Sequence, residues 1–261
     1  MSGRRAAARW WTLRRSLALA LAWALALAWA PLARAAPPEP LRLVAADLPP
    51  YAAAQGGDSP GALVELAQEM ARRVGAPATV EFYPWQRALA LTGVHSRTLV
   101  VPLTRTPERE AHYRWLVRLR RQDFVFVGRH GGGVDLRDPA ALAARPVAVL
   151  RGSPHKRLLE SLHFSAVAEC ASVRECMRMV SKGVVDATYG GEDIHRYAAR
   201  LDGFHEADFD FSPVFSSGDI WLAGSRDIGE DECRAWRAAH EAMRADGTLA
   251  RLLHKYGLAP N

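Results

Sequence analysis

Short apolar runs alternate with amphipathic segments along the chain from about residue 41 onward. Each run has the length of a buried strand, and each amphipathic segment opens at a capping residue or a proline, with several closed by a glycine. The predicted strands are 41–46, 78–82, 99–101, 124–127, 147–150, 184–189 and 220–223. The predicted helices begin at Ser59-Pro60, Pro84, Thr106-Pro107, Asp138-Pro139, Ser153-Pro154, Ser172, Glu192, Glu230 and Thr248, with stops at Gly75, Gly93 and Gly183. This alternation predicts an α/β fold with mostly parallel sheets.

Two stretches rich in small residues divide this pattern. One contains Gly131-Gly132-Gly133, and the other, residues 211–218, is rich in Ser, Pro and Gly. The segment between them carries its own set of strands and helices, which favours an inserted lobe. We therefore predict two lobes, each with a mostly parallel sheet flanked by helices. Residues 36–122 and 217–261 would form the first lobe and 123–216 the second, joined by a two-strand hinge.

The first 35 residues follow a different pattern. An arginine-rich start precedes residues 16–30, an uncharged run of mainly Ala, Leu and Trp, and Ala33-Arg34-Ala35 has the small-x-small form of a cleavage site. The apolar run is shorter than the roughly 20 residues of a spanning helix. We interpret residues 1–35 as a cleaved signal peptide that directs the protein to the periplasm. An uncleaved membrane anchor is the alternative.

The net charge belongs to this leader. The whole chain has 34 Lys and Arg against 28 Asp and Glu, a formal charge of +6. Six arginines and no Lys, Asp or Glu lie in residues 1–35, which leaves 28 basic residues against 28 acidic ones. A basic chain would favour a nucleic-acid partner, but the neutral remainder removes that argument.

Candidate catalytic and metal-binding motifs are missing from the sequence. The nine histidines show no metal-ligand spacing, and there is no nucleophile elbow or phosphate-binding loop. We predict no catalytic residue, no metal and no cofactor. In an oxidising compartment Cys170 and Cys176 could form a local disulfide or remain reduced, with Cys233 left over.

Six segments taken together resemble the family 3 periplasmic solute-binding proteins, the type associated with uptake of polar amino acids. They cover almost all of the chain after the leader. The segments are Asp47-Leu48-Pro49-Pro50-Tyr51, Gly61-Ala62-Leu63-Val64-Glu65-Leu66, Leu103-Thr104-Arg105-Thr106-Pro107-Glu108-Arg109, Val149-Leu150-Arg151-Gly152-Ser153, Gly183-Val184-Val185-Asp186-Ala187, and Asp246-Gly247-Thr248-Leu249 with Lys255-Tyr256-Gly257.

The resemblance implies a type II periplasmic binding fold, a two-lobed clamp that closes on a small ligand. The expected partners are an amino acid or organic acid and a membrane component. That component would be the permease of an ABC transporter or a sensor. We expect a monomer without enzymatic activity. A dehydratase acting on cyclohexadienyl acids, a minority activity of this fold, is a further alternative.

Arg109 is the strongest candidate for ligand binding. A guanidinium can pair with a carboxylate through two parallel hydrogen bonds. The resemblance implies that Arg109 grips the carboxylate of the ligand and that Thr104 adds a hydroxyl donor. Read without the resemblance, Arg109 would be a surface arginine paired with Glu108 or Glu110.

Aromatic and acidic residues near the first lobe form a second group. Tyr51 and Trp85 could form an aromatic wall around a ligand, or pack in a loop and in the core respectively. Asp47 could receive a cation of the ligand or cap its own loop.

The second lobe offers an anion site at a predicted helix start. Gly152 and Ser153 would expose backbone amides there, or serve only as a cap. His155 follows in the first helical turn and could contact the ligand.

One departure from the family concerns the ligand's amine. Amino-acid binders of this family carry an acid shortly after the Asp-Ala strand, and that place falls on Gly191. Glu192 and Asp193 follow, so a shifted loop could still supply a carboxylate. Glu192 and His155 are also the only obvious general acids if the cleft were catalytic.

Overall fold

The computed structural model describes residues 40–55 and 59–260. The predicted signal peptide, residues 1–35, lies outside the described residues. Pro40–Asn261 forms one compact unit in which strands and helices alternate, so the predicted α/β class is confirmed. Among the described residues no helix has both the length and the apolar character needed to span a membrane.

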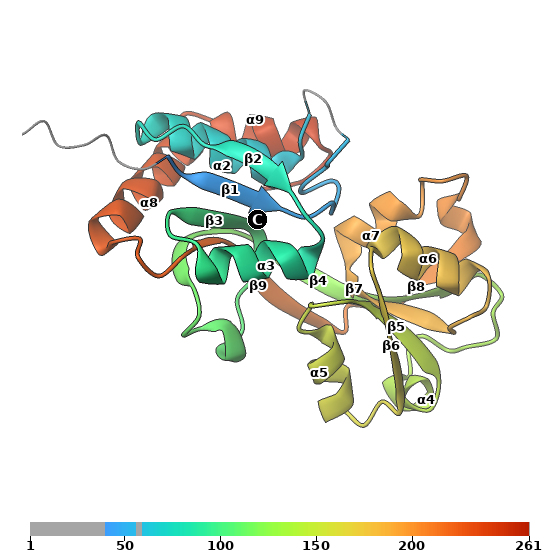
Figure 1. Cartoon of the computed structure of the whole chain (residues 1–261). Coiled ribbons are helices and arrows are strands. Elements are labelled where there is room, and N and C mark those ends of the chain that lie inside the picture. Colours follow the sequence, from blue (N-terminus) through green and yellow to red (C-terminus); the bar gives the residue numbers. More distant parts are fainter. Residues whose placement is uncertain (1–39, 56–58, 261) are drawn as a thin grey trace, which may run out of the picture. The chain divides into compact units, whose positions relative to one another are not determined.

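All strands of the described residues join in one sheet (Figure 1). In order across the sheet they are β2 (Thr79–Phe82), β1 (Arg42–Ala45), β3 (Thr98–Thr104), β9 (Ser216–Gly224), β4 (Arg114–Arg129), β7 (Ala187–Gly191), β5 (Pro146–Leu150) and β6 (Ala166–Cys170), while β8 (Phe209–Phe211) pairs with β4.

The helices pack against the sheet in two groups. Helices α2, α8 and α9 contact one another, α2 and α3 also contact β3, and α4 to α7 contact β5 or its neighbours. Their bounds are α2 (Ala62–Arg73), α3 (Trp85–Val94), α4 (Pro139–Ala143), α5 (His155–Ser161), α6 (Val173–Ser181), α7 (Glu192–Ala198), α8 (Glu230–Ala245) and α9 (Thr248–Lys255), with 3-10 turns η1 (Pro107–Arg109) and η2 (Glu206–Asp208).

Parallel pairing holds among the short strands at both ends of the sheet. Strand β1 pairs in parallel with β2 and β3, and β5 pairs in parallel with β6 and β7. The long strand β4 is antiparallel to its partners: it pairs with β9 over Arg114 to Phe124 and with β7 over Phe124 to Gly128. Strand β4 therefore carries the sheet from one set of parallel strands to the other.

Each set of parallel strands has a hydrophobic cluster. The larger cluster includes Leu43, Leu63, Leu99 and Trp236, all fully buried, and it extends to α6 and α7. The smaller cluster lies under α4 and α5, where the Phe126 and Phe164 rings stack 5.7 Å apart. Apolar burial on this scale is the main favourable term for folding.

Helix boundaries differ from the prediction at three places. Helix α2 begins at Ala62 rather than at Ser59-Pro60, because Gly61 has φ +105° and lies against the backbone of Ala52. A Cβ at Gly61 would come within 2.5 Å of that backbone, so only glycine fits there. Helix α3 continues through Gly93 to Val94, and Thr106-Pro107 opens only the short turn η1.

The largest difference from the prediction is the length of β4. Only residues 124–127 were expected as strand. The structure extends the strand back to Arg114 and buries Arg120, which is 5% exposed. Strand β6 was not predicted at all.

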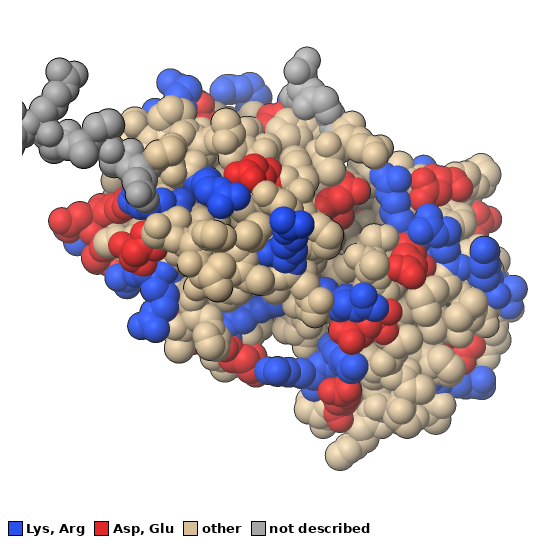
Figure 2. Space-filling model, in the orientation of Figure 1, with Lys and Arg blue, Asp and Glu red and all other residues tan. Residues whose placement is uncertain are grey.

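The predicted lobe boundaries fall inside continuous strands. Residues 122 and 123 lie within β4, and residues 216 and 217 lie in β9, where Gln122 pairs with Gly218 and Asp123 with Ser217. Gly131-Gly132-Gly133 instead follows the end of β4. On the face seen in Figure 2, blue basic and red acidic side chains are interspersed rather than separated by sign, in keeping with a balanced charge.

Candidate functional site

Two adjoining cavities open where the ends of β3, β5 and β7 come together. The inner chamber has a volume of about 60 Å³ and the outer basin about 860 Å³. Both are lined by Thr104, Arg109, Phe124, Ser153, Pro154 and His155, which we call the shared wall. Ligand pockets typically occupy about 300–1,000 Å³. A small ligand at the shared wall would therefore fill the chamber and extend into the basin.

Arg109 joins two distant parts of the chain across this wall. One terminal nitrogen, Nη1, donates to the backbone oxygen of Thr104 at the end of β3 (3.1 Å). The other, Nη2, donates to the backbone oxygen of Gly152 after β5 (2.9 Å). Burial lowers the pKa of Arg109, yet a guanidinium stays charged at any physiological pH.

No carboxylate lies within ion-pair distance of Arg109. Within residues 40–55 and 59–260 Arg109 forms no ion pair: Glu110 pairs with Arg105 (2.8 Å), and Glu108, the preceding residue, acts on the Arg109 charge only by attraction at longer range. The two carbonyl oxygens that Arg109 contacts are neutral, and each terminal nitrogen carries a second N–H. A largely desolvated cation in this state favours an incoming anion.

The turn after β5 supplies the acceptor for Arg109. Gly152 adopts φ +78°, which directs the chain from the strand into α5. The helix begins at His155, two residues after Ser153, and the Ser153 hydroxyl accepts a long hydrogen bond from the His155 amide (3.4 Å). The predicted helix start thus lies on the shared wall.

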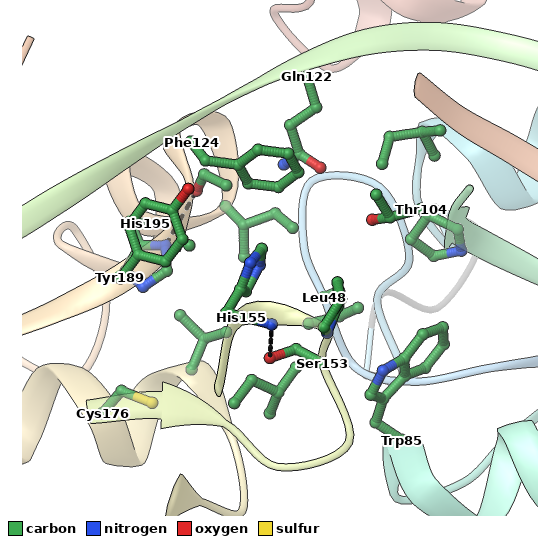
Figure 3. A pocket seen from close by; sticks show the side chains of 18 of the residues that line it. Leu48, Trp85, Thr104, Gln122, Phe124, Ser153, His155, Cys176, Tyr189 and His195 are labelled. Atoms are coloured by element: carbon green, nitrogen blue, oxygen red, sulfur yellow. Dashed lines mark hydrogen bonds between the residues drawn. The ribbon is translucent and has the colours of Figure 1, made fainter. Parts of the chain in front are cut away.

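Aromatic side chains surround His155 and form part of the lining of the chamber (Figure 3). The His155 ring lies 4.9 Å from the ring of Phe124 and 5.0 Å from that of Tyr189, both in edge-to-face contact. Burial is the main cause that lowers the pKa of His155 to about 3, so its imidazole is neutral. Trp85, 6% exposed, lines the chamber from the start of α3.

Sequence reasoning missed a second group of chamber residues: Gln122, Phe124, Tyr189, Gly190 and His195. His195 is buried, which lowers its pKa to about 4, and its Nδ1 is 2.9 Å from the Gly191 oxygen. The Tyr189 hydroxyl is 2.7 Å from that of Ser216. Each of these residues lies on β4, β7 or the first turn of α7. For Gln122 the missed signal was the alternation of apolar residues along β4, which the arginines of that strand interrupt.

Gln122 occupies the space that a side chain at Gly191 would need. A Cβ built on Gly191 would overlap the amide nitrogen of Gln122. Gln122 is 4% exposed, and this nitrogen has no hydrogen-bond partner among the described residues. In Figure 3 the Gln122 side chain extends from β4 to a position beside Phe124.

Three predicted site residues do not line the chamber or the basin. The Tyr51 hydroxyl donates to Asp193 (2.7 Å), and the Arg120 guanidinium lies over the Tyr51 ring and pairs with Asp193 (3.1 Å). Asp47 accepts from the Ala54 amide (3.0 Å) and so closes its own loop. Glu192 accepts from Arg196 (2.8 Å) one helical turn away.

Among the described residues, no group of three or more His, Cys, Asp or Glu side chains is placed to hold a metal ion. Cys176, which also lines the chamber, is joined by a disulfide to Cys170 at the end of β6.

Comparison with solved structures identifies the fold. The GluR0 ligand-binding core from Nostoc punctiforme, in complex with (L)-glutamate, superposes with a TM-score of 0.73 at 17% identity, over 83% of this chain and 99% of that one. A histidine kinase sensor domain with similarity to periplasmic binding proteins gives 0.76 at 15% identity, over 85% and 98%. The substrate-binding protein AbpA of an amino acid ABC transporter from Streptococcus pneumoniae, bound to L-arginine, gives 0.71 at 16% identity, over 82% and 94%.

These likenesses show the type II periplasmic-binding-protein fold, as the sequence predicted. Curated protein sequences yield no match. The sequence profile of one family matches residues 42–259, nearly everything that the structure describes. The chain therefore belongs to the bacterial extracellular solute-binding proteins, family 3.

Proposed function

We propose that this protein binds a small carboxylate-bearing ligand, an amino acid or a related organic acid, at the shared wall. The observation that carries the proposal is the partly buried Arg109 guanidinium, which donates to two neutral carbonyl oxygens and forms no ion pair with the described residues. A ligand carboxylate would supply the missing charge through the remaining N–H groups. Thr104 and Ser153 stand beside it as further hydroxyl groups of the wall.

The ligand would be enclosed by closure of two lobes. Residues 36–122 with 217–261 would move against residues 123–216, with β4 and β9 as the two strands of the hinge. Arg109 supports this proposal because it contacts Thr104 in the first segment and Gly152 in the second. Contacts from both lobes would favour the closed state, so binding would shift a hinge equilibrium.

Binding without catalysis suits the shared wall better than an acid-catalysed elimination. The general acids considered from sequence were Glu192 and His155. Glu192 does not line either cavity, and His155 is not an imidazolium acid at neutral pH, since its pKa is lowered to about 3. Neither of these two residues therefore supports the dehydratase alternative.

We place the protein in the periplasm as a monomer that delivers its ligand to the permease of an ABC transporter. Membership of an extracellular family and the predicted leader in residues 1–35 support export. A sensory role remains the second candidate, because a histidine kinase sensor domain shares the fold.

Thermal-shift screening of amino acids and organic acids tests the proposal. A ligand at 100 times its Kd should stabilise the fold by about 2.7 kcal/mol. Replacing Arg109 by Ala should weaken binding roughly 10- to 100-fold, since a charge-assisted hydrogen bond contributes about 1.5–3 kcal/mol. Arg118→Ala is the matched control, because Arg118 is an exposed arginine paired with Asp219 and lies on neither cavity.

The proposal is wrong if no acid stabilises the protein. It is also wrong if Arg109→Ala binds the best acid as tightly as the Arg118→Ala control does.

A further inference from the structure

Basic residues outnumber acidic ones along the lining of both cavities. Arg109 is the one residue with a permanent charge among those that line the chamber, and no Asp or Glu lines it. The basin adds three basic residues, Arg105, Lys156 and Arg157, and two acidic ones, Glu108 and Glu169. Glu169 is paired with Lys156 (3.3 Å). A cavity with this balance attracts anions and repels cations.

The two carboxylates at the start of α7, next to the chamber residues Gly191 and Ile194, are already engaged. Asp193 accepts from the Tyr51 hydroxyl and pairs with Arg120, which is itself buried. Glu192 pairs with Arg196 one turn further along α7, and Arg196 also pairs with Glu206. Recruiting either acid would leave a cation without its partner, at a cost of about 3–5 kcal/mol where that cation is buried.

A neutral amide stands where the chamber would otherwise have room for another side chain. Because Gly191 has no side chain, Gln122 fills this space, 96% buried and with an amide nitrogen that lacks a partner among the described residues. The N–H of a carboxamide can donate a hydrogen bond to an oxygen of a ligand, but the group carries no charge. The unmatched amide nitrogen calls for an acceptor such as a carbonyl, hydroxyl or carboxylate oxygen.

The two imidazoles of the chamber do not alter this balance. His155 and His195 are both neutral, because burial lowers their pKa to about 3 and about 4. The groups packed around His155 are Phe124 and Tyr189, with Arg109 and His195 close enough to disfavour its protonation. Neutral rings can accept a hydrogen bond but cannot balance an ammonium charge.

We infer that the ligand is a net organic anion: a carboxylic acid that has an apolar or aromatic body, an oxygen to accept from Gln122, and no cationic amine. This inference rests on the proposed function, since it assumes that Arg109 holds the carboxylate. An ammonium group in the chamber would be desolvated beside a guanidinium and with no counter-charge. Phe124, Trp85 and Tyr189 would enclose the body of the ligand.

The test compares pairs of acids in which a 2-oxo group takes the place of the ammonium group on the α-carbon. Calorimetric titrations at pH 7.5 would use four pairs: pyruvate and L-alanine, 2-oxoglutarate and L-glutamate, 4-methyl-2-oxopentanoate and L-leucine, and phenylpyruvate and L-phenylalanine. In the pair that binds best, the 2-oxo acid should bind at least about tenfold more tightly than its amino acid.

A charge introduced at Gln122 should weaken that preference. Gln122→Glu places a carboxylate in the chamber, so the ratio of the two dissociation constants should shift towards the amino acid by about tenfold or more. Gln68→Glu makes the same chemical change on α2, away from both cavities, and should leave the ratio unchanged. Circular dichroism would establish that both variants fold, and the wild-type ratio stands as a test by itself.

Each outcome is decisive. An amino acid that binds as tightly as its 2-oxo partner, with binding lost in Arg109→Ala, would overturn this inference and leave the proposed function standing. Failure of all eight compounds to bind would overturn both. Tighter binding of the 2-oxo acid, lost in Arg109→Ala, would support both.

Discussion

At the scale of single residues, the candidate site depends on what Gly191 lacks. Its backbone has ordinary φ, so the glycine is not required by conformation. It is required by space, because the amide of Gln122 occupies the position of a side chain. The neighbouring Gly190 leaves room for the His195 ring in the same way, because a Cβ on Gly190 would lie 2.5 Å from that ring.

Gly191→Ala should therefore destabilise the protein by about 1–3 kcal/mol, the usual range for overpacking a buried site. Gly93→Ala is the matched control, because Gly93 lies in helix α3 with nothing within 4 Å of a built Cβ. Alanine there should leave stability unchanged or raise it by up to about 1 kcal/mol. Urea unfolding of both variants gives the comparison, and equal stability of the two would contradict this account of Gly191.

The buried histidines predict a loss of stability in mild acid. The pKa of His155 is lowered to about 3 and that of His195 to about 4, whereas both would titrate near 6.5 in the unfolded chain. Between these values the unfolded chain binds more protons, so stability is present above pH 6.5 and falls as the pH is lowered. From pH 7.5 to 5.5 each histidine should cost about 1 kcal/mol of the free energy of unfolding.

Urea unfolding at both pH values measures this loss. His155→Phe keeps an aromatic ring in the chamber and should remove the part of the loss that His155 contributes, about 1 kcal/mol. His240, whose pKa is also lowered by burial, adds to what remains. The paired acids Glu69, Glu81 and Asp246 do not interfere in this window. Their pKa is lowered to about 2, so their contribution is lost only below about pH 4.5. A His155→Phe variant that loses as much stability as the wild type between pH 7.5 and 5.5 would contradict a neutral, buried His155.

Residue types in the sequence located part of the site. The two cavities are lined by Arg109, Thr104, Trp85 and the turn from Gly152 to His155. These residues lie where a strand ends or a helix begins, and local sequence motifs mark such positions. Tyr51, Asp47 and Glu192 look equally suitable in sequence. Their partners, however, are Asp193, Ala54 and Arg196, and contacts such as the one across 142 positions from Tyr51 to Asp193 are set by the tertiary fold.

At the scale of elements, β4 does most to position the site. Residues Gln122 and Phe124 lie on it next to the point where its pairing passes from β9 to β7. The strand was largely missed because exposed Arg118 and Arg121 stand beside buried Arg120, which hides the period of two. Arg120 is buried through its ion pair with Asp193, and no local pattern reveals that partner.

The disulfide between β6 and α6 should hold the wall of the chamber near Cys176. Closing so short a loop stabilises the native state by about 2 kcal/mol in the chain-entropy account. Reduction should lower the melting temperature of the wild type, and the double variant Cys170→Ala with Cys176→Ala should no longer respond to reductant. Cys233→Ala, which removes the buried free cysteine, should keep the full response. A wild type insensitive to reductant, with two free thiols by mass spectrometry, would contradict the pairing.

At the scale of the whole molecule, one sheet carries both sets of parallel strands. The α/β class followed from the strand and helix alternation, since each unit has a local signature. The order of strands across the sheet did not, because β9 comes late in the chain and inserts between β3 and β4. The cavities lie where these distant segments meet, which is why the lining could be predicted only in part.

The central claim is that Arg109 holds the carboxylate of a small ligand at the shared wall. A crystal structure grown with the most stabilising acid of the thermal-shift panel tests it most directly. The account predicts a carboxylate about 2.7–2.9 Å from the guanidinium nitrogens of Arg109, with the rest of the ligand beside Phe124 and Gln122. A ligand bound elsewhere, or an Arg109 that still contacts only the oxygens of Thr104 and Gly152, would contradict it.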